Sequence, residues 1–226
     1  MPKALFVEME AKAGAEADIE SFLREALDTA EGEPHTRDWY ALRFDEHRFA
    51  IFDTFEGNLH RLKHLLGGIG RRIVVKTLTE LSGLPEMHSY ELVAAKLPNG
   101  AGKPGAAYFV PFETKLGGGR DFGEVLVSAR AIVEEEAAML AWYALRSGPN
   151  SFAVLGFLAD DAARDAHISG LFGERIRDTV GPFLEAPPAY RSAWVLGAKH
   201  SGWNAMTSAE QQMHPEQPVR VAPEAP

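Results

Sequence analysis

Residues 39–43 read Trp-Tyr-Ala-Leu-Arg, and the same five residues stand again at 142–146. A shift of 103 residues brings the rest of the chain into register with itself without a gap. The matched sets include Phe49-Ala50-Ile51 with Phe152-Ala153-Val154, His64 with His167, and Ala95-Lys96 with Ala198-Lys199. Self-similarity at a fixed offset indicates an internal duplication in which every loop has kept its length.

The duplication sets the expected domain boundaries. The first repeat covers residues 3–97 and the second covers residues 106–200. Between them, residues 98–105 are rich in Gly and Pro, which is typical of a flexible linker. The tail, residues 201–226, is rich in Pro, Gln and Glu, so we expect its end to be disordered.

Composition narrows the class of protein. The chain has 226 residues, of which 46% are hydrophobic and 24% charged, as is typical of a folded, water-soluble protein. It has no cysteine, which excludes disulfides and thiolate metal sites and fits a reducing cytoplasm. A net charge of −9 argues against nucleic acid as a partner, and no apolar run is long enough to predict a membrane span. We therefore expect a cytoplasmic protein that handles a small molecule.

Each repeat predicts the order strand, helix, strand, strand, helix, strand. In the first repeat, short apolar segments predict strands at 5–9, 39–44, 49–55 and 89–96, and helical periodicity predicts helices at 18–30 and 59–81. The second repeat has the same pattern, with a second helix at about 162–184 that its glycines could interrupt. This is the ferredoxin-like plan, in which a four-stranded sheet carries its helices on one face.

Two such units in one chain can bury their bare sheet faces against each other, since a unit of about 95 residues is small for standing alone. We expect an α+β fold in which two ferredoxin-like repeats pack sheet to sheet as a pseudo-twofold barrel with the helices outside. One chain would then hold a complete pseudo-dimer, and further association into a homo-oligomer is left open. The alternative is two independent ferredoxin-like domains.

The same residues carry a resemblance to a known family. The segments 39–43, 49–55 and 64–67, with their counterparts in the second repeat, resemble the antibiotic biosynthesis monooxygenase family of the dimeric α+β barrel superfamily. The resemblance implies a barrel that is usually made by two subunits and is here fused. It also implies a range of activities, because characterised members include cofactor-free oxygenases of quinols and polycyclic phenols, haem-degrading enzymes and lactone isomerases.

Candidate site residues recur in both repeats. Trp39 and Arg43 are four residues apart on one predicted strand, so their side chains share a face, and the same holds for Trp142 and Arg146. If that face lines the barrel, each pair offers an aromatic wall and a cation to a planar phenolate. The alternative is a Trp in the core and an Arg at the end of a strand.

Two histidines are candidate bases. His64 and His167 each precede a glycine on the second helix of their repeat, where a neutral imidazole could accept a phenolic proton near pH 7. The alternative is a histidine that only packs the helix against the sheet. In the first repeat Phe52 and Asp53 are further ligand-binding candidates, whereas Gly156 replaces Asp53 in the second. Because the first repeat keeps more polar groups, we expect it to hold the better ligand site.

Other motifs predict no cofactor and no metal. Residues 117–123 do not have the spacing of a dinucleotide-binding glycine loop, and they align with an ordinary helix start at 14–20. His60 and His64 have the spacing of a metal pair but lack a third ligand. The acidic run 134–136 aligns with 31–33, and we expect it to be a solvated turn.

Three functions remain open. The first is a cofactor-independent monooxygenase of a small phenolic or quinol-like molecule, with His64 or His167 as the base and Arg43 or Arg146 stabilising the anion. The second is a non-catalytic barrel that binds a small aromatic ligand or serves in stress. The third is a haem-degrading enzyme.

Overall fold

The computed structural model describes residues 3–33, 36–55, 68–98 and 102–200. The first repeat contains β1 (Lys3–Glu10), α1 (Glu16–Glu31), β2 (Thr36–Arg43), β3 (Arg48–Phe55), α3 (Gly68–Thr79) and β4 (Glu86–Lys96). The second contains β5 (Ala106–Glu113), α4 (Gly119–Glu135), β6 (Met139–Arg146), β7 (Ser151–Leu158), α5 (Asp161–Ser169), α6 (Leu171–Val180), the short helix η1 (Gly181–Phe183) and β8 (Arg191–His200). The tail and the centre of the expected linker lie outside the described residues, so their flexibility stays a prediction.

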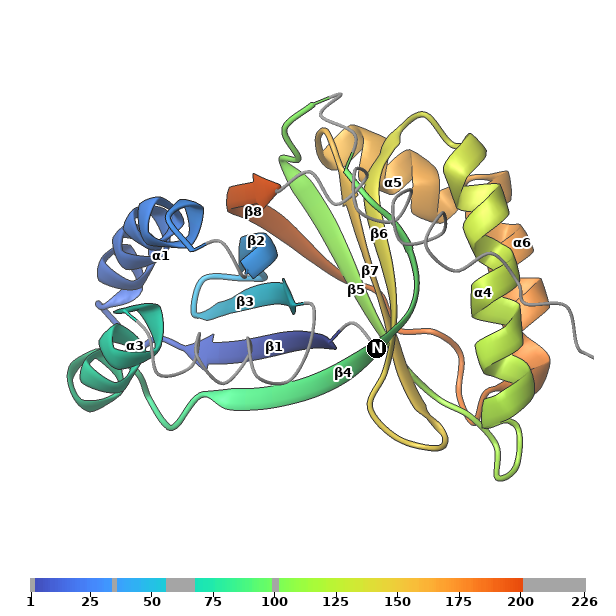
Figure 1. Cartoon of the computed structure of the whole chain (residues 1–226), viewed down its shortest axis with the longest axis horizontal. Coiled ribbons are helices and arrows are strands. Elements are labelled where there is room, and N and C mark those ends of the chain that lie inside the picture. The colour runs from blue at the N-terminus through green and yellow to red at the C-terminus, as the bar shows by residue number, and fades with distance from the viewer. Residues whose placement is uncertain (1–2, 34–35, 56–67, 99–101, 201–226) are drawn as a thin grey trace, which may run out of the picture.

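The eight strands form one closed antiparallel barrel in the order β1-β3-β2-β8-β5-β7-β6-β4 (Figure 1). Strands of the first repeat run β4-β1-β3-β2 around the barrel, and those of the second run β8-β5-β7-β6, so both sheets have the predicted ferredoxin-like order. The pairs β2–β8 and β4–β6 join the two sheets. This pairing confirms the predicted α+β barrel and excludes two independent domains.

The last strand of each repeat belongs to both sheets. Residues 86–91 of β4 pair with β1 of their own repeat, and residues 91–96 pair with β6 of the other. In β8, residues 191–194 pair with β5 and residues 194–200 pair with β2. The end of each repeat's last strand therefore pairs with the second strand of the other repeat's sheet.

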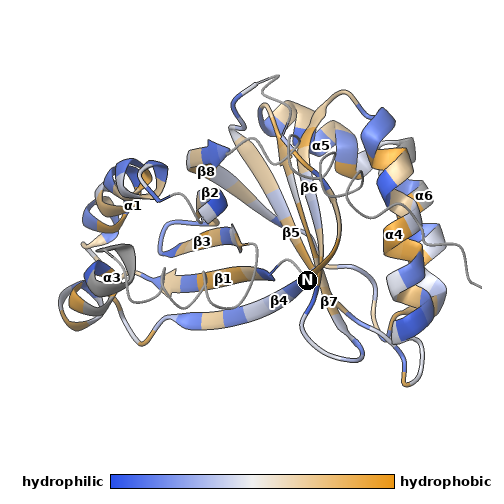
Figure 2. Cartoon of the chain, in the orientation of Figure 1, coloured by the Kyte–Doolittle hydropathy of each residue, from blue (hydrophilic) through white to orange (hydrophobic). Residues whose placement is uncertain are grey.

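Apolar side chains form three layers. One cluster fills the barrel and consists of strand residues from both repeats. A second lies between the sheet of the first repeat and α1, and a third lies between the sheet of the second repeat and its helices α4 and α6. The helices lie outside the barrel at its two sides (Figure 1), and hydrophilic and hydrophobic residues alternate along α4 (Figure 2). Both faces of the strands are thus buried, as the near-continuous apolar segments require.

Equivalent residues of the two repeats meet inside the barrel. The rings of Phe6 and Phe109 stack with their centroids 4.7 Å apart. The hydroxyl oxygens of Tyr40 and Tyr143 lie 3.0 Å apart. Each pair is separated by 103 residues in the sequence, so a local twofold axis passes between its members.

A polar network breaks this symmetry at the tyrosine pair. Asp38 is buried in β2, and its carboxylate accepts a hydrogen bond of 3.0 Å from the Thr54 hydroxyl and another from the hydroxyl of Tyr143. The Tyr40 hydroxyl lies 3.3 Å from Nδ1 of His200. The second repeat has Ala141 where the first has Asp38, so the barrel carries this buried acid on one side.

The second helix of the second repeat is divided, as its glycines suggested. α5 ends at Ser169 and α6 starts at Leu171. At Gly170, between the two helices, a Cβ would lie 2.5 Å from the Ala166 carbonyl oxygen. Within the described ranges, no helix has the length and apolar character needed to cross a membrane.

Candidate functional site

His167 is buried on the helix-facing side of the second repeat's sheet. It lies in the last turn of α5, whose start is capped by the Asp160 carboxylate accepting the Ala163 N–H at 2.8 Å. The side chain is 3% exposed and points toward β5 and the end of α4. A histidine so deeply buried must have its ring nitrogens paired, because an unpaired polar group would be costly there.

Both ring nitrogens of His167 have hydrogen-bond partners. Nδ1 lies 2.8 and 3.0 Å from the two carboxylate oxygens of Glu136, and Nε2 lies 3.0 Å from the Tyr108 hydroxyl. An ionised carboxylate can only accept, so we assign the ring proton to Nδ1, which leaves Nε2 to accept the Tyr108 O–H. The Tyr108 and His167 rings also stack, with their centroids 5.2 Å apart.

The hydroxyl of Tyr108 lies on the side of His167 opposite to Glu136 in this series of hydrogen bonds. Burial raises its pKa well above the ordinary value, and the nearby Tyr190 and Glu136 raise it further. A hydrogen bond from the Trp142 indole acts in the opposite direction. Tyr108 is therefore a neutral donor at physiological pH, and the donors run from Trp142 through Tyr108 and His167 to Glu136. We call these four residues the relay.

A small cavity adjoins the relay. Its volume is about 30 Å³, enough for one water-sized molecule. Besides Tyr108, Trp142 and His167 it is lined by apolar side chains of the sheet, α4 and α6 and by Tyr190. The cavity thus presents a hydroxyl, an imidazole and an indole in otherwise apolar surroundings, which is the usual composition of a ligand pocket.

Gly156 makes room for Tyr108. In the register of β5, β7 and β6, Gly156 stands opposite both Tyr108 and Trp142. A Cβ on Gly156 would lie 2.4 Å from the Tyr108 ring. The first repeat has Leu5 and Asp53 at these two positions, so its counterpart of the relay has a different composition.

The structure brings together two of the predicted residues, His167 and Trp142, which both line the cavity. His64 and His60 lie outside the described residues. Which repeat holds the better ligand site therefore stays a prediction.

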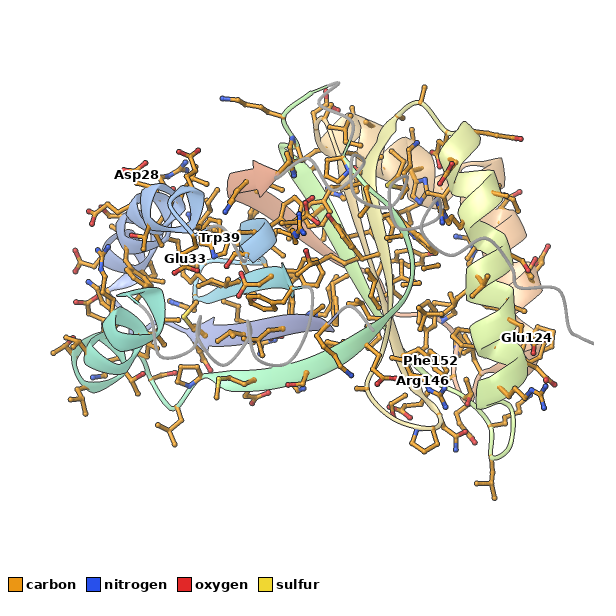
Figure 3. All side chains as sticks on the ribbon, viewed as in Figure 1. Asp28, Glu33, Trp39, Glu124, Arg146 and Phe152 are labelled. Atoms are coloured by element: carbon orange, nitrogen blue, oxygen red, sulfur yellow. The ribbon has the colours of Figure 1, made fainter. Side chains whose placement is uncertain are left out.

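The strand face that carries Trp39 and Arg43 packs against helices. The hypothesis that this face lines the barrel interior is therefore wrong. Trp39 lies in the layer between the sheet and α1 (Figure 3). Trp142 lies in the corresponding layer of the second repeat, with residues of α4. Tyr40, one residue on, points into the barrel instead. The alternation of side chains along a strand indicates which residues share a face, but it does not indicate which face points into the barrel.

Phe52 and Asp53 lie on opposite faces of β3. Phe52 belongs to the barrel cluster, where its ring lies 5.0 Å from that of Tyr143. Asp53 is buried on the helix side, opposite Leu5 and Trp39 in the register. The two candidates therefore face different layers and do not share one pocket.

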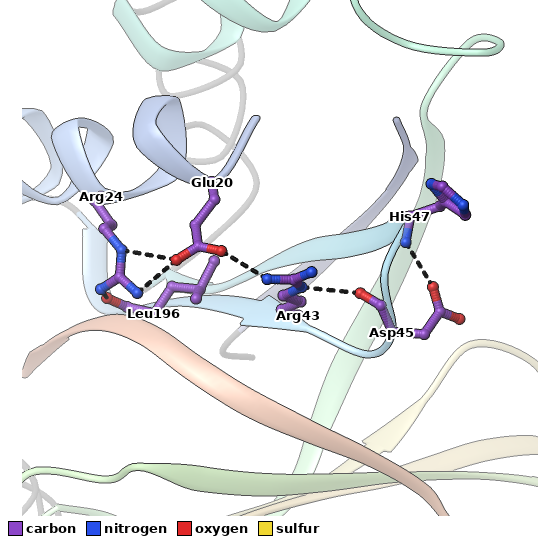
Figure 4. A network of polar contacts seen from close by, with 6 residues as sticks. All are labelled: Glu20, Arg24, Arg43, Asp45, His47 and Leu196. Carbon is purple, nitrogen blue, oxygen red and sulfur yellow. Dashed lines mark hydrogen bonds and ion pairs between the residues drawn. The ribbon is translucent and has the colours of Figure 1, made fainter. Parts of the chain in front are cut away.

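Arg43 is held at the edge of the first repeat (Figure 4). Its guanidinium forms a 2.9 Å ion pair with Glu20 and donates a 3.0 Å hydrogen bond to the Asp45 carbonyl oxygen. It also lies over the Phe49 ring at 5.6 Å. Glu20 is shared with Arg24, so this arginine is part of a surface network that fixes α1 to the end of β2.

Arg146 has the matching place in the second repeat. It donates a 2.9 Å hydrogen bond to the Gly148 carbonyl oxygen and lies 5.5 Å from the centre of the Phe152 ring (Figure 3). It therefore closes the β6–β7 turn, and it is not among the residues that line the cavity at His167. Among the described residues, Trp142 and His167 thus line the cavity together without an arginine.

Tyr108 and Glu136 are functional candidates that the sequence did not indicate. Glu136 was expected in a solvated turn, yet its carboxylate contacts the buried His167. The sequence contains one signal for Glu136, because the equivalent position of the first repeat, Glu33, is also an acid. The preceding position is not kept in this way, since it is Gly32 in the first repeat and Glu135 in the second. For Tyr108 no such signal exists, since its counterpart is Leu5.

No protein-family model and no curated protein matches this chain. Among solved structures, a putative monooxygenase from Fusobacterium nucleatum subsp. nucleatum is 15% identical, with a TM-score of 0.78 over 89% of this chain and 95% of its own. An anthrone oxidase-like protein is 11% identical, with a TM-score of 0.61 over 89% and 93%. A ferredoxin fold protein from Listeria monocytogenes 4b, related to antibiotic biosynthesis monooxygenases, is 9% identical, with a TM-score of 0.53 over 85% and 94%. These likenesses confirm the fold that the sequence resemblance implied.

Proposed function

We propose that this chain, which has the fold of the antibiotic biosynthesis monooxygenase-like barrels, is a cofactor-independent oxygenase of a small phenolic or quinol-like molecule. The observation that carries the proposal is the hydrogen-bonded chain from Glu136 through His167 to Tyr108, which ends at an apolar cavity. The names of two structural neighbours, a putative monooxygenase and an anthrone oxidase-like protein, support this reaction class.

The relay can remove a proton from the substrate. The Tyr108 hydroxyl would pass its proton to Nε2 of His167 as it takes one from a substrate hydroxyl or an acidic ring carbon. The Glu136 carboxylate then stabilises the imidazolium through Nδ1, as an orienting acid does for a general base. The apolar lining excludes water, which strengthens these charge interactions.

The substrate anion supplies the electrons, so no cofactor is required by the chemistry. An anion of a ring methylene group activated by phenolic rings can reduce O₂ directly. In the balanced reaction CH₂ + O₂ gives C=O + H₂O, with one oxygen atom in the product and the other in water. The protein contributes the base, a dry site and a hydrogen-bond donor to the developing anion, a role open to Tyr108 once it has taken the substrate's proton.

An outer groove offers space for the ring system. It lies between α4 and α6, and its volume is about 340 Å³, in the range of small-molecule pockets. Val125, Ala129 and Ile176 line both this groove and the small cavity at the relay. We propose that an aromatic substrate enters from the groove when these three side chains move apart, and that O₂ occupies the inner cavity.

Oxygen consumption tests the proposal. Purified protein is supplied with a panel of quinols and polycyclic phenols in an oxygen electrode, beside the variants His167→Ala and His47→Ala. We expect uptake with at least one substrate, its loss in His167→Ala, and no change in His47→Ala, whose side chain lies 43% exposed at the β2–β3 turn. His64→Ala, measured in parallel, reports whether the first repeat works as well.

Two outcomes would overturn the proposal. No uptake with any substrate, together with binding of the aromatic molecules, would favour a non-catalytic binding protein. A Soret band on addition of haem, followed by haem breakdown with a reductant, would favour a haem-degrading enzyme.

A further inference from the structure

A lysine from the first repeat caps a helix of the second. The Lys96 ammonium, near the end of β4, donates to the carbonyl oxygens of Val133, Glu134 and Glu136 at 3.0, 3.3 and 2.7 Å. These carbonyls end α4, whose last turn contains no basic residue. A cation at this position satisfies unpaired carbonyl groups and complements the negative end of the helix dipole.

The duplication repeats the arrangement in the other direction. Lys199 of β8 donates to the carbonyl oxygens of Ala30 and Glu33 at 2.6 and 2.5 Å, at the end of α1. That helix also lacks a basic residue in its last turn. Each lysine reaches its target because the last strand of its repeat pairs with the second strand of the other, which places Lys96 opposite Trp142 and Lys199 opposite Trp39.

We infer that Lys96 is a positioning residue for the relay of the second repeat, an inference that rests on the proposed function. Glu136 is the residue that follows α4, and its carbonyl oxygen accepts from both the Lys96 ammonium and the Met139 N–H, at 2.7 and 3.1 Å. The same residue's carboxylate holds Nδ1 of His167. Lys96 thus fixes the backbone from which the orienting acid reaches the base.

Lys96 also adjoins the other end of the relay. Its register partner Trp142 is the residue whose indole donates to Tyr108. Burial lowers the pKa of Lys96, and the nearby Glu136 and Glu134 oppose that change. The first repeat therefore supports the relay of the second from the end of β4, through the Glu136 carbonyl and the strand partner Trp142.

The mirrored lysine provides a matched control. Lys96→Met and Lys199→Met each remove one cross-repeat cap, but only the first cap holds Glu136. In ¹⁵N-resolved NMR spectra we expect Lys96→Met to shift the His167 ring N–H and Trp142 indole signals, while Lys199→Met leaves them unchanged. Lys96→Arg, which retains the donors, should restore the wild-type signals. If Lys96→Met does not fold, Lys96→Gln serves in its place.

Activity gives a second measurement. With a substrate in hand, we expect Lys96→Met to lower the kcat of oxygen uptake by about tenfold to a hundredfold, since small misplacements of a catalytic group have effects of that size. Equal shifts of the His167 signals in both lysine variants, or none in either, would overturn the positioning role. Because the NMR comparison needs no substrate, it stands even if wild-type protein consumes no oxygen, which would overturn only the proposed function.

Discussion

The hydroxyl oxygens of Tyr40 and Tyr143 lie 3.0 Å apart inside the barrel, and these two residues, which hold the same position in the two repeats, have different further hydrogen-bond partners. Tyr143 is also bonded to the buried Asp38, whereas Tyr40 lies near His200. The contact between these two equivalent tyrosines therefore belongs to a hydrogen-bond network that does not follow the twofold symmetry of the repeats. The duplication preserved the packing of the barrel while its polar interior diverged.

Removing the two hydroxyls should have unequal effects. Tyr143→Phe withdraws a donor from the buried Asp38 carboxylate, so we expect it to lower the free energy of unfolding by about 2–3 kcal/mol. Tyr40→Phe removes a hydroxyl whose hydrogen-bond partners are neutral groups, so it should lower the free energy of unfolding by only about 1 kcal/mol. Urea unfolding monitored by circular dichroism measures both values. Equal losses would show that Asp38 does not depend on Tyr143.

Asp38 should make the fold less stable as the pH rises. Burial is the largest cause that raises its pKa from 3.8 to about 6, so the folded state binds the Asp38 proton more tightly than the unfolded chain does. The contribution to stability is then full below pH 4 and is lost as the pH rises through 6, by about 3 kcal/mol in total. Asp38→Asn should abolish this loss.

The measurement is the difference in unfolding free energy between Asp38→Asn and wild-type protein at several pH values from 4 to 7. Other carboxylates, such as Glu20 and Asp45, have a lowered pKa and act in the opposite sense, but they are common to both proteins and cancel in the difference. We expect the variant to gain stability relative to wild type with rising pH. A constant difference would contradict the assignment of a raised pKa to Asp38.

Much of the fold was predictable because the sequence repeats itself. The offset of 103 residues gave the two four-stranded units and their order, and the need to bury two bare sheet faces gave the barrel. The interior face was not predictable. Trp39 and Tyr40 are both fully buried, so hydrophobicity does not distinguish the face toward the helices from the face toward the barrel.

The candidate site was predictable only in part, because its residues lie far apart in the sequence. His167 and Trp142 stood out because both recur in the two repeats. The partners of His167, however, are 31 residues away in Glu136 and 59 residues away in Tyr108, and they come from a helix end and a different strand. No local spacing could indicate that these side chains converge.

Arg146→Met should affect stability and not catalysis. The guanidinium binds the carbonyl oxygen of Gly148 in the β6–β7 turn and covers the Phe152 ring, so its loss should cost about 1 kcal/mol in the free energy of unfolding. It does not line the cavity at His167, so oxygen uptake per folded molecule should stay at the wild-type level. A fall in kcat without a change in stability would restore Arg146 as a candidate anion stabiliser.

Gly156 and Tyr108 should be coupled. A Cβ at residue 156 would lie 2.4 Å from the Tyr108 ring, so Gly156→Ala must displace the tyrosine and with it the hydrogen bond to His167. We expect that substitution alone to lower the free energy of unfolding by about 2–3 kcal/mol, the usual range for overpacking. In a Tyr108→Leu background, which carries the residue found at position 5 in the first repeat, the same change should cost less than about 1 kcal/mol.

The double-mutant cycle of these two residues gives a coupling energy from four unfolding curves. Gly123→Ala is a suitable control for the added methyl group, because its Cβ would lie 3.8 Å from the nearest atom, on Phe152, and alanine favours the helix in which it stands. It should leave the fold as stable or more so. Additive effects of Gly156→Ala and Tyr108→Leu would mean that the tyrosine can occupy another position at little cost, and that the glycine is not what keeps the relay in place.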